Sequence, residues 1–219
     1  MTQNIRYQDL VIKDGKLVGD WESLYKNFDD PWMQSRLDHK LDTRRQISIL
    51  ACQRLRDQHQ SLKVLELGCG FGFITQSLTD LKFDAVGMDI SKHAVEKAKD
   101  KNPEAKFRIG QFDDFDFIRE FNPDILIMAE LTWYVLEKLD SFIHNLKEFA
   151  KSRENPVFLI HLLNTYKPGV QKYGLEKFKN HGEILDYFKL DFLESGYIET
   201  RRPDDPESGG SYFIARVTV

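Results

Sequence analysis

The sequence predicts an α/β fold in which helices cover both faces of a mostly parallel sheet. From residue 62 onward, short apolar runs alternate with helical patterns. Such alternation is typical of parallel strands joined by right-handed crossovers. The first apolar run leads into a loop with glycines at alternate positions, and the second run ends in an acidic residue. A glycine loop between a strand and a helix, followed by an acid at the next strand end, indicates a nucleotide-binding edge.

Residues 1–60 precede this alternation and are predicted to form a hairpin and a helical lid. Leu10–Val18 holds two short apolar runs around an Asp-Gly pair, the pattern of a two-residue hairpin. Trp21–Phe28 places apolar side chains at i, i+3, i+4 and i+7, which favours a short helix. Pro31 ends that helix, because the residue before a proline is pushed out of the α region. A longer helix is expected from about Ser35 to His59.

The second predicted unit spans residues 61–219. Strands are expected near 63–67, 83–88, 105–109, 124–129 and 156–162, and helices near 72–80, 91–101, 114–121 and 137–152.

The end of this unit is predicted differently, beginning with a loop at Leu163–Gly169 and a lid insertion near 165–182. A helix from Glu183 to Ser195 would follow, with Gly196 as its C-cap. Two last strands, Tyr197–Arg201 and Ser211–Val217, would close the sheet as an antiparallel edge.

The composition narrows the class of protein. The 219 residues are 41% hydrophobic and 30% charged, as in ordinary globular proteins. The net charge of −4 provides no basic footprint for nucleic acid. Cys52 and Cys69 are the only cysteines, so we expect neither a disulfide framework nor a zinc cluster. No apolar run suits a signal core or a membrane span, so a cytoplasmic protein is expected.

The spacing of the glycine loop decides between nucleotide ligands. The loop reads Glu66-x-Gly68-x-Gly70-x-Gly72, with Phe73 where a dinucleotide fingerprint would have its third glycine. It also lacks the Lys-Ser or Lys-Thr pair of a phosphate loop. This pattern resembles motif I of class I S-adenosylmethionine-dependent methyltransferases.

The resemblance implies a Rossmann-like, mostly parallel seven-stranded sheet with an antiparallel C-terminal strand. It also implies S-adenosyl-L-methionine as donor and S-adenosyl-L-homocysteine as product. In the family, the glycines pass close to the amino-acid part and ribose of the donor, and the acid matching Glu66 orders the loop and takes part in binding. Cys69 is interpreted as a small residue within this tight loop.

Asp89 ends the second predicted strand, 17 residues beyond Gly72. This distance suits a carboxylate that accepts hydrogen bonds from both ribose hydroxyls. The family likeness implies this role for Asp89 and adenine packing for Ile90. The alternative is that Asp89 only caps the following helix, although Ser91 can cap that helix itself.

The end of the third predicted strand gives a weaker signal. The family often has an Asp there that accepts from the adenine amino group, and this sequence has Gln111 followed by Phe112. The Gln111 carbonyl can accept the same hydrogen bond. Alternatively, Asp113 or Asp114 reaches the adenine after a register shift.

The fourth predicted strand is followed by Glu130, Leu131, Trp133 and Tyr134. The carboxyl ends of strands bind ligands in open α/β sheets. The resemblance implies that the backbone of Glu130 and Leu131 lies against the methionine part of the donor. One aromatic ring is expected in the core, and Tyr134 is expected at the methyl-transfer site. His161, at the end of the fifth strand, is the best-placed candidate for a general base.

Asp30-Pro31-Trp32 also has a parallel, since it resembles the entry of nodulation-factor-type N-methyltransferases. In those enzymes the N-terminal part folds over the donor. The likeness makes Trp32 and Arg45 candidates for closing the pocket, with a guanidinium available for the donor carboxylate. An exposed arginine and a packed tryptophan are the alternative.

The sequence therefore predicts a methyltransferase, monomeric or homodimeric, that acts on an O or N of a small polar metabolite. The acceptors considered are sugars, nucleotide-linked sugars and phosphate-bearing precursors, as in surface-polysaccharide or secondary-metabolite pathways. Two other classes stay open: a non-catalytic S-adenosylmethionine-binding partner protein, and a nucleotide-dependent oxidoreductase.

Overall fold

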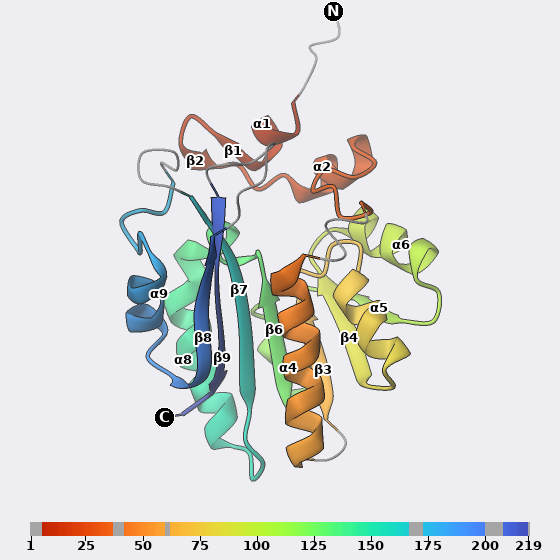
Figure 1. The fold of residues 1–219 in the computed structure, drawn as a ribbon. Coiled ribbons are helices and arrows are strands. Elements are labelled where there is room, and N and C mark those ends of the chain that lie inside the picture. Colours follow the sequence, from red (N-terminus) through yellow and green to blue (C-terminus); the bar gives the residue numbers. More distant parts are fainter. Residues whose placement is uncertain (1–5, 37–41, 60–61, 167–172, 200–207, 219) are drawn as a thin grey trace, which may run out of the picture.

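The computed structural model describes residues 6–36, 42–59, 62–166, 173–199 and 208–218. A seven-stranded sheet with the order β5-β4-β3-β6-β7-β9-β8 forms its centre (Figure 1). The strands are Lys63–Leu67 (β3), Asp84–Asp89 (β4), Lys106–Ile109 (β5), Ile125–Ala129 (β6), Phe158–Tyr166 (β7), Asp191–Glu199 (β8) and Ser208–Arg216 (β9).

Strands β3 to β7 run parallel to one another, and β9 runs antiparallel between β7 and β8. The predicted fold class is confirmed, including the seven strands and the antiparallel C-terminal strand. The first four predicted strands match β3 to β6 within one residue at each end.

Helices cover both faces of the sheet (Figure 1). On one face lie Thr43–His59 (α4), Phe73–Asp80 (α5) and Lys92–Lys101 (α6); on the other lie Phe115–Phe121 (α7), Leu139–Lys151 (α8) and His181–Phe188 (α9). The short 3₁₀ turns Thr132–Tyr134 (η1) and Leu136–Lys138 (η2) connect β6 to α8.

Strand β6 shows why the sheet needs helices on both of its faces. Its side chains alternate between the faces, as in any strand. Ile125 and Ile127 are buried in the core beneath α4 and α5, whereas Leu126 and Met128 are buried in the core beneath α7, α8 and α9. An uninterrupted apolar strand is therefore stable only at the centre of the sheet.

The N-terminal segment lies across the carboxyl ends of the parallel strands, at the top of Figure 1. It contains Tyr7–Val11 (α1), a hairpin of Ile12–Lys13 (β1) and Lys16–Leu17 (β2), and Trp21–Asn27 (α2). The Asp-Gly hairpin is confirmed, and both turn residues have positive φ, as a type I′ turn requires. The expected first hairpin strand was placed too early, because Leu10 and Val11 belong to α1.

The long N-terminal helix begins later than expected. Helix α4 starts at Thr43, and residues 37–41 lie outside the described residues. Ser35 is not helical. The Asp30 carboxylate accepts hydrogen bonds from the backbone N–H groups of Gln34 and Ser35, both at 2.7 Å, and holds this stretch in a turn. The carboxylate thus offers the backbone an alternative to helix formation.

The C-terminal part shows two further differences. Strand β7 continues to Tyr166 instead of ending at residue 162, because β9 pairs with all nine of its residues. Of the expected insertion at 165–182, residues 167–172 lie outside the described part of the chain.

The predicted helix from Glu183 to Ser195 is wrong beyond residue 188. Lys189 adopts a left-handed conformation, with φ of 49°, and ends α9. Strand β8 then begins at Asp191. Gly196 lies within β8 opposite Tyr212, where a Cβ would come within 2.7 Å of the tyrosine ring, so it is not a C-cap.

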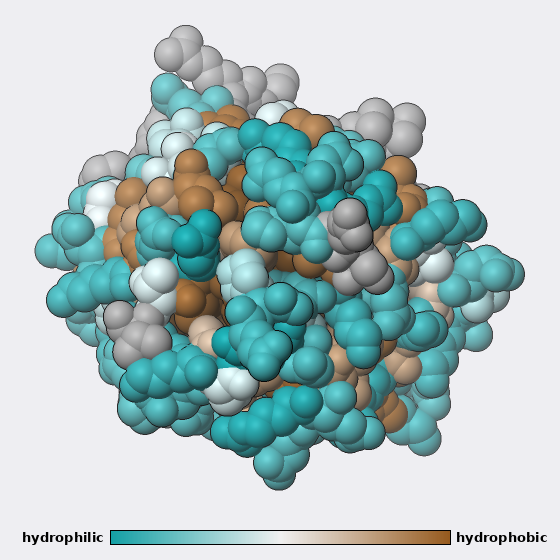
Figure 2. Space-filling view, turned by 90° about the horizontal axis from the view of Figure 1, so that it is seen from below, coloured by the Kyte–Doolittle hydropathy of each residue, from teal (hydrophilic) through white to brown (hydrophobic). Residues whose placement is uncertain are grey.

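The amino ends of the strands, seen from below in Figure 2, present a mainly hydrophilic surface with hydrophobic residues between the polar ones. The features that the sequence singled out lie at the opposite end, beneath the N-terminal segment. The division into a lid and a methyltransferase domain stays a prediction.

Candidate active site

The loop between β3 and α5 is shaped by three glycines with positive φ: 69° at Gly68, 53° at Gly70 and 72° at Gly72. A side chain at any of them would be strained. It would also collide with a neighbour: Leu131 at Gly68, Gln34 and Tyr25 at Gly70, and the Phe107 ring at Gly72. The glycines therefore allow other parts of the chain to pack directly on the loop.

Glu66 fastens this loop to α5. Its buried carboxylate accepts hydrogen bonds from the Thr75 backbone N–H, at 2.9 Å, and from the Thr75 hydroxyl. Burial raises the pKa of Glu66 to about 7. Cys69 lies buried in the same loop, and burial raises the pKa of its thiol well above the usual value. A thiol so protected suits a packing role, in agreement with its interpretation as a small loop residue.

Asp89 joins the glycine loop to the end of β4. One carboxylate oxygen accepts from the Gly70 N–H at 2.9 Å, and the other accepts from the Ser91 N–H at 3.0 Å. Burial raises the pKa of Asp89. The hydroxyl of Ser91 accepts from the Ala94 N–H and caps α6 itself. Asp89 therefore joins the loops that follow β3 and β4, whereas Ser91 caps the helix.

A cleft of about 720 Å³ opens beside Asp89 at the ends of β4 and β5, lined by Ile90, Ile109, Gly110 and Gln111 among others. Its volume lies in the range usual for ligand pockets, about 300–1,000 Å³. Ile90 is 51% exposed and Ile109 is 49% exposed. Two apolar side chains open to solvent beside an acid suit a planar base attached to a ribose.

The other residues predicted for adenine are placed less directly. The Gln111 carbonyl accepts from Lys138 Nζ at 3.0 Å, and the same ammonium lies 3.0 Å from Asp113. Phe112 packs against Phe142 in the core, with ring centroids 5.2 Å apart. Gln111 therefore lines the cleft, whereas the Phe112 ring contributes to the core behind it.

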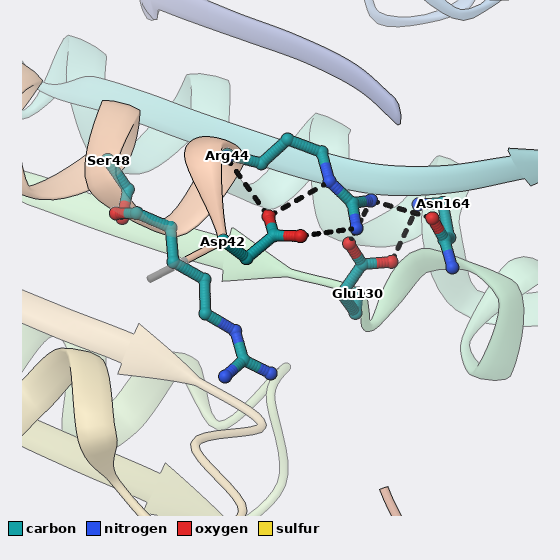
Figure 3. Close-up of polar contacts among 6 residues, drawn as sticks. Asp42, Arg44, Ser48, Glu130 and Asn164 are labelled. Atoms are coloured by element: carbon teal, nitrogen blue, oxygen red, sulfur yellow. Dashed lines mark hydrogen bonds and ion pairs between the residues drawn. The ribbon is translucent and has the colours of Figure 1, made fainter. Parts of the chain in front are cut away.

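Glu130 lies at the end of β6, beside the start of α4 (Figure 3). Its Oε1 atom is 2.7 Å from Arg44 Nη1, and its Oε2 atom accepts from the Asn164 N–H at 2.6 Å. The sequence singled out Arg45 but not Arg44 or Asn164. Successive residues of a helix are rotated by about 100°, so adjacent arginines point to different sides. Only the packing of α4 could show which of the two arginines contacts Glu130.

Two neighbouring aromatic residues have different surroundings, as expected. Trp133 is buried against Phe178, and its indole N–H donates to the Asn164 carbonyl at 2.7 Å. Tyr134 instead faces the N-terminal segment, with its ring 5.0 Å from Trp21 and 5.7 Å from Trp32.

The N-terminal segment contacts the glycine loop through one turn. Asp30 holds the turn, and the Gln34 side-chain carbonyl accepts from the Phe71 N–H at 3.0 Å. The Trp32 indole donates to the Tyr25 hydroxyl at 3.1 Å, above Gly70. The Asp-Pro-Trp stretch thus places one amide and two aromatic rings over the loop. Gln34 and Tyr25 carried no recognisable motif in the sequence.

His161 is 0% exposed. Its Nε2 atom lies 2.7 Å from the Thr132 hydroxyl, and its ring stacks on Phe213 at 4.6 Å. Burial lowers the pKa of His161 to about 3, which keeps the imidazole neutral. A ring without exposed surface offers no atom to a substrate in this conformation.

The described residues lack two kinds of feature. They contain no group of three or more His, Cys, Asp or Glu side chains placed to hold a metal ion. Nor does any helix within the described ranges have the length and apolar character to cross a membrane.

Comparisons with known proteins agree with this fold. Residues 64–153 match a family described as "Methyltransferase domain". No curated protein sequence matches the chain.

Similar solved structures include TehB from Haemophilus influenzae, with 19% identity and a TM-score of 0.55 over 77% of this chain and 61% of that one. A SAM-dependent methyltransferase from Methanosarcina mazei has 13% identity and a TM-score of 0.58 over 76% and 97% of the two chains. The bifunctional kinase-methyltransferase WbdD has 20% identity and a TM-score of 0.60 over 86% and 42%. The chain thus spans less than two thirds of TehB and less than half of WbdD.

Gly72→Ala is expected to lower the free energy of unfolding by about 2–4 kcal/mol, because it adds a left-handed alanine and an overlap with Phe107. Urea unfolding measures the change. Gly182→Ala is the matched control: a Cβ there would meet only Asn180, at 3.4 Å, within a helix that favours alanine. Equal stabilities for the two variants would contradict the packing of Phe107 on the loop.

His161 predicts a pH dependence of stability. Its pKa is about 3 when folded and about 6.5 when unfolded. The unfolded chain therefore binds more protons between these values, and stability is lost as the pH falls from about 6.5, by about 1.4 kcal/mol per pH unit. Glu66 acts oppositely, because its raised pKa removes stability as the pH rises from about 4.5 to 7.

Comparison of the wild type with His161→Gln isolates the histidine. The free energy of unfolding, measured from about pH 4 to 6.5, should rise less steeply with pH in the variant. If the two proteins show the same dependence of unfolding free energy on pH, His161 is not held as a buried, neutral imidazole.

Proposed function

Because the chain belongs to the class I S-adenosylmethionine-dependent methyltransferase family, we propose that it transfers a methyl group from S-adenosylmethionine to an oxygen or nitrogen of a small polar metabolite. One observation carries the proposal. Asp89, whose buried carboxylate is tied to Gly70, immediately precedes Ile90, and the exposed side chains of Ile90 and Ile109 line the cleft at the ends of β4 and β5. A ribose acceptor and an apolar platform for a base thus lie side by side.

The residues present fit this donor. We assign the ribose hydroxyls to Asp89, since a carboxylate has about four lone-pair sites, more than the backbone N–H groups of Gly70, Ser91 and Ile90 occupy. We assign the adenine to Ile90, Gln111 and the backbone of Phe112. The donor, when bound, supplies an electrophilic methyl group on a sulfonium.

The amino-acid part of the donor is assigned to the glycine loop, to the backbone of Glu130 and Leu131, and to Arg45. Leu131 supports this assignment, because its side chain packs where a Cβ on Gly68 would lie. Trp32 covers the same region through Tyr25 and Tyr134.

The acceptor is assigned to the space beneath the N-terminal segment, next to Tyr134. An amine that has lost its proton needs mainly alignment with the methyl group, and positioning supplies most of the acceleration. A hydroxyl acceptor needs a base within hydrogen-bond reach. The burial of His161 does not support that role. We propose sugars, nucleotide-linked sugars and phosphate-bearing precursors as acceptors, as in surface-polysaccharide or secondary-metabolite pathways.

A thermal-shift panel tests the donor. S-adenosylhomocysteine at about 100 times its Kd should add about 2.7 kcal/mol of stability. NAD at the same concentration should add none, because the family does not use a dinucleotide. A melt that neither ligand shifts would refute the proposed function.

Methyl transfer from labelled S-adenosylmethionine into a fractionated metabolite extract tests the reaction. We expect one labelled small-molecule fraction, which identifies the acceptor. Donor binding without labelling of any fraction would favour a non-catalytic donor-binding protein.

Asp89→Ala should weaken binding of S-adenosylhomocysteine by about 1.5–3 kcal/mol, because two charge-assisted hydrogen bonds to the ribose are lost. Isothermal titration calorimetry measures the loss. Ser91→Ala is the control, since it removes the α6 cap, at a cost of about 1 kcal/mol in stability, and the contact of the hydroxyl with Glu22, but leaves the Asp89 carboxylate in place. If Asp89→Ala binds S-adenosylhomocysteine with normal affinity, Asp89 does not bind the ribose and only organises the loops.

A further inference from the structure

We propose that a cavity between α4, α5 and the end of α6 binds a small phosphorylated polyol, as a ligand distinct from the donor and the acceptor. The cavity has a volume of about 380 Å³ and extends to the turn at Ser35. This volume lies within the range usual for ligand pockets. The inference goes beyond the proposed function and does not depend on it, because it concerns another part of the molecule.

The cavity is separate from the cleft at the ends of β4 and β5. The cleft is lined by those strand ends and by residues of α7 and α8, whereas the cavity is lined by residues of α4, α5 and the end of α6. These two sets of helices cover opposite faces of the sheet (Figure 1). The described linings have no residue in common. A ligand of the cavity therefore leaves the cleft open.

Two cationic side chains line the cavity, Arg45 from α4 and Lys101 from the end of α6. Burial lowers the pKa of Arg45, and the nearby carboxylates oppose that change only in part, so an anion beside the guanidinium would offset the cost of burial. Lys101 forms no ion pair with any described residue, and its Nζ atom lies 5.2 Å from the centroid of the Phe71 ring. None of the described lining residues is acidic. The cavity therefore suits an anion, and phosphate is bound well by both guanidinium and ammonium groups.

Two neutral side chains of the lining offer hydrogen-bond acceptors rather than donors. The Asn102 amide uses both of its hydrogens, since it donates to the Phe71 carbonyl at 2.7 Å and to the Ala98 carbonyl at 3.1 Å. The Ser77 hydroxyl donates to the Phe73 carbonyl at 2.8 Å. The side-chain oxygens of Asn102 and Ser77 can still accept hydrogen bonds. Acceptors of this kind suit the hydroxyl groups of a ligand.

Gln76 gives an independent indication of a ligand hydroxyl. Its Nε2 atom donates to Asp80 Oδ1 at 2.7 Å, and the carboxylate would repel the amide oxygen, so the orientation of the amide is fixed. The Oε1 atom of Gln76 is buried and has no hydrogen-bond partner in the described part of the chain. A buried acceptor without a partner costs free energy. Because Gln76 lines the cavity, a ligand hydroxyl at this wall would supply the missing partner.

These groups together define the class of ligand. The cations bind a phosphate, and the acceptor oxygens bind hydroxyl groups. Ile49 and Phe73 add apolar lining, which suits a carbon chain. A phosphorylated polyol combines all three features. Asn102 also fixes the wall of the cavity, because its amide ties the end of α6 to the glycine loop before any ligand binds.

Isothermal titration calorimetry with three probes at equal ionic strength tests the class of ligand. Glycerol 3-phosphate carries a phosphate and two hydroxyl groups, and inorganic phosphate and glycerol represent its two halves. We expect glycerol 3-phosphate to bind about 10-fold more tightly than inorganic phosphate, since only the former can also pair the acceptor oxygens through a carbon chain. Glycerol alone should give no measurable heat of binding.

The same titrations in saturating S-adenosylhomocysteine test whether the site is separate from the donor. Arg45, which we also assign to the donor carboxylate, has five N–H donors and can contact two anions. We therefore expect the affinity for glycerol 3-phosphate to change by less than about threefold. Displacement of glycerol 3-phosphate would instead assign the cavity to the amino-acid part of the donor and overturn the inference.

Lys101→Met tests the cationic wall. It keeps most of the side chain beside Phe71 and removes the charge, so it should weaken both phosphate probes by about 10-fold. Lys99→Met is the matched control, because Lys99 lies in the same last turn of α6 but does not line the cavity. It should leave both affinities within about twofold. Equal losses in the two variants would mean that phosphate is attracted only by the general charge of the surface.

Gln76→Leu tests the acceptor wall. It removes the unpaired oxygen and keeps a side chain of similar size. We expect glycerol 3-phosphate to bind about 3- to 10-fold more weakly, and inorganic phosphate to change by less than about twofold.

Three further results would overturn the inference: no binding of either phosphate probe, equal affinities of the wild type for both phosphate probes, or an unchanged affinity for glycerol 3-phosphate in Gln76→Leu. Failure of the proposed function looks different. A chain that bound no S-adenosylhomocysteine would still give the same three measurements in the absence of that ligand.

Discussion

The edge of the sheet at which we propose that the donor binds depends on one buried carboxylate. Asp89 accepts hydrogen bonds from the Gly70 and Ser91 N–H groups and so joins the loops that follow β3 and β4. Without it, two buried donors would be left unpaired, at about 1–3 kcal/mol each. The glycine loop shaped in this way is the surface on which Gln34 and Phe107 pack. The N-terminal cover and the α6 face therefore both depend on Asp89.

The loops at this edge of the sheet bury two carboxylates, and burying a charged group costs free energy. Burial raises the pKa of Asp89 and of Glu66, so both charges are less stable than in water. Backbone N–H groups at the loops offset part of this cost. The partly exposed carboxylate of Glu130 instead forms an ion pair with Arg44. An edge that gathers carboxylates in this way favours ligands that bring hydroxyl or ammonium donors.

The N-terminal segment covers the end of the sheet at which we propose that the donor and the acceptor bind. Polar contacts hold its rim: Glu22 contacts the Ser91 hydroxyl at 2.7 Å, and Lys97 donates to the Phe28 carbonyl at 2.9 Å. Aromatic rings fill its centre, where Trp21 packs edge-on against Tyr134. A segment that is held by partly buried polar contacts and a small aromatic cluster separates from the sheet at lower cost than the main core does.

The sequence by itself determined the sheet, the glycine loop and the acid at the end of β4. These features depend on local rules: apolar runs form buried strands, glycines permit positive φ, and spacing fixes the strand end. Tertiary structure alone decided that Arg44 rather than Arg45 contacts Glu130, that His161 is core, and that residues 191–199 form a strand. Each of these depends on which partner lies opposite, and a partner distant in sequence leaves no local pattern.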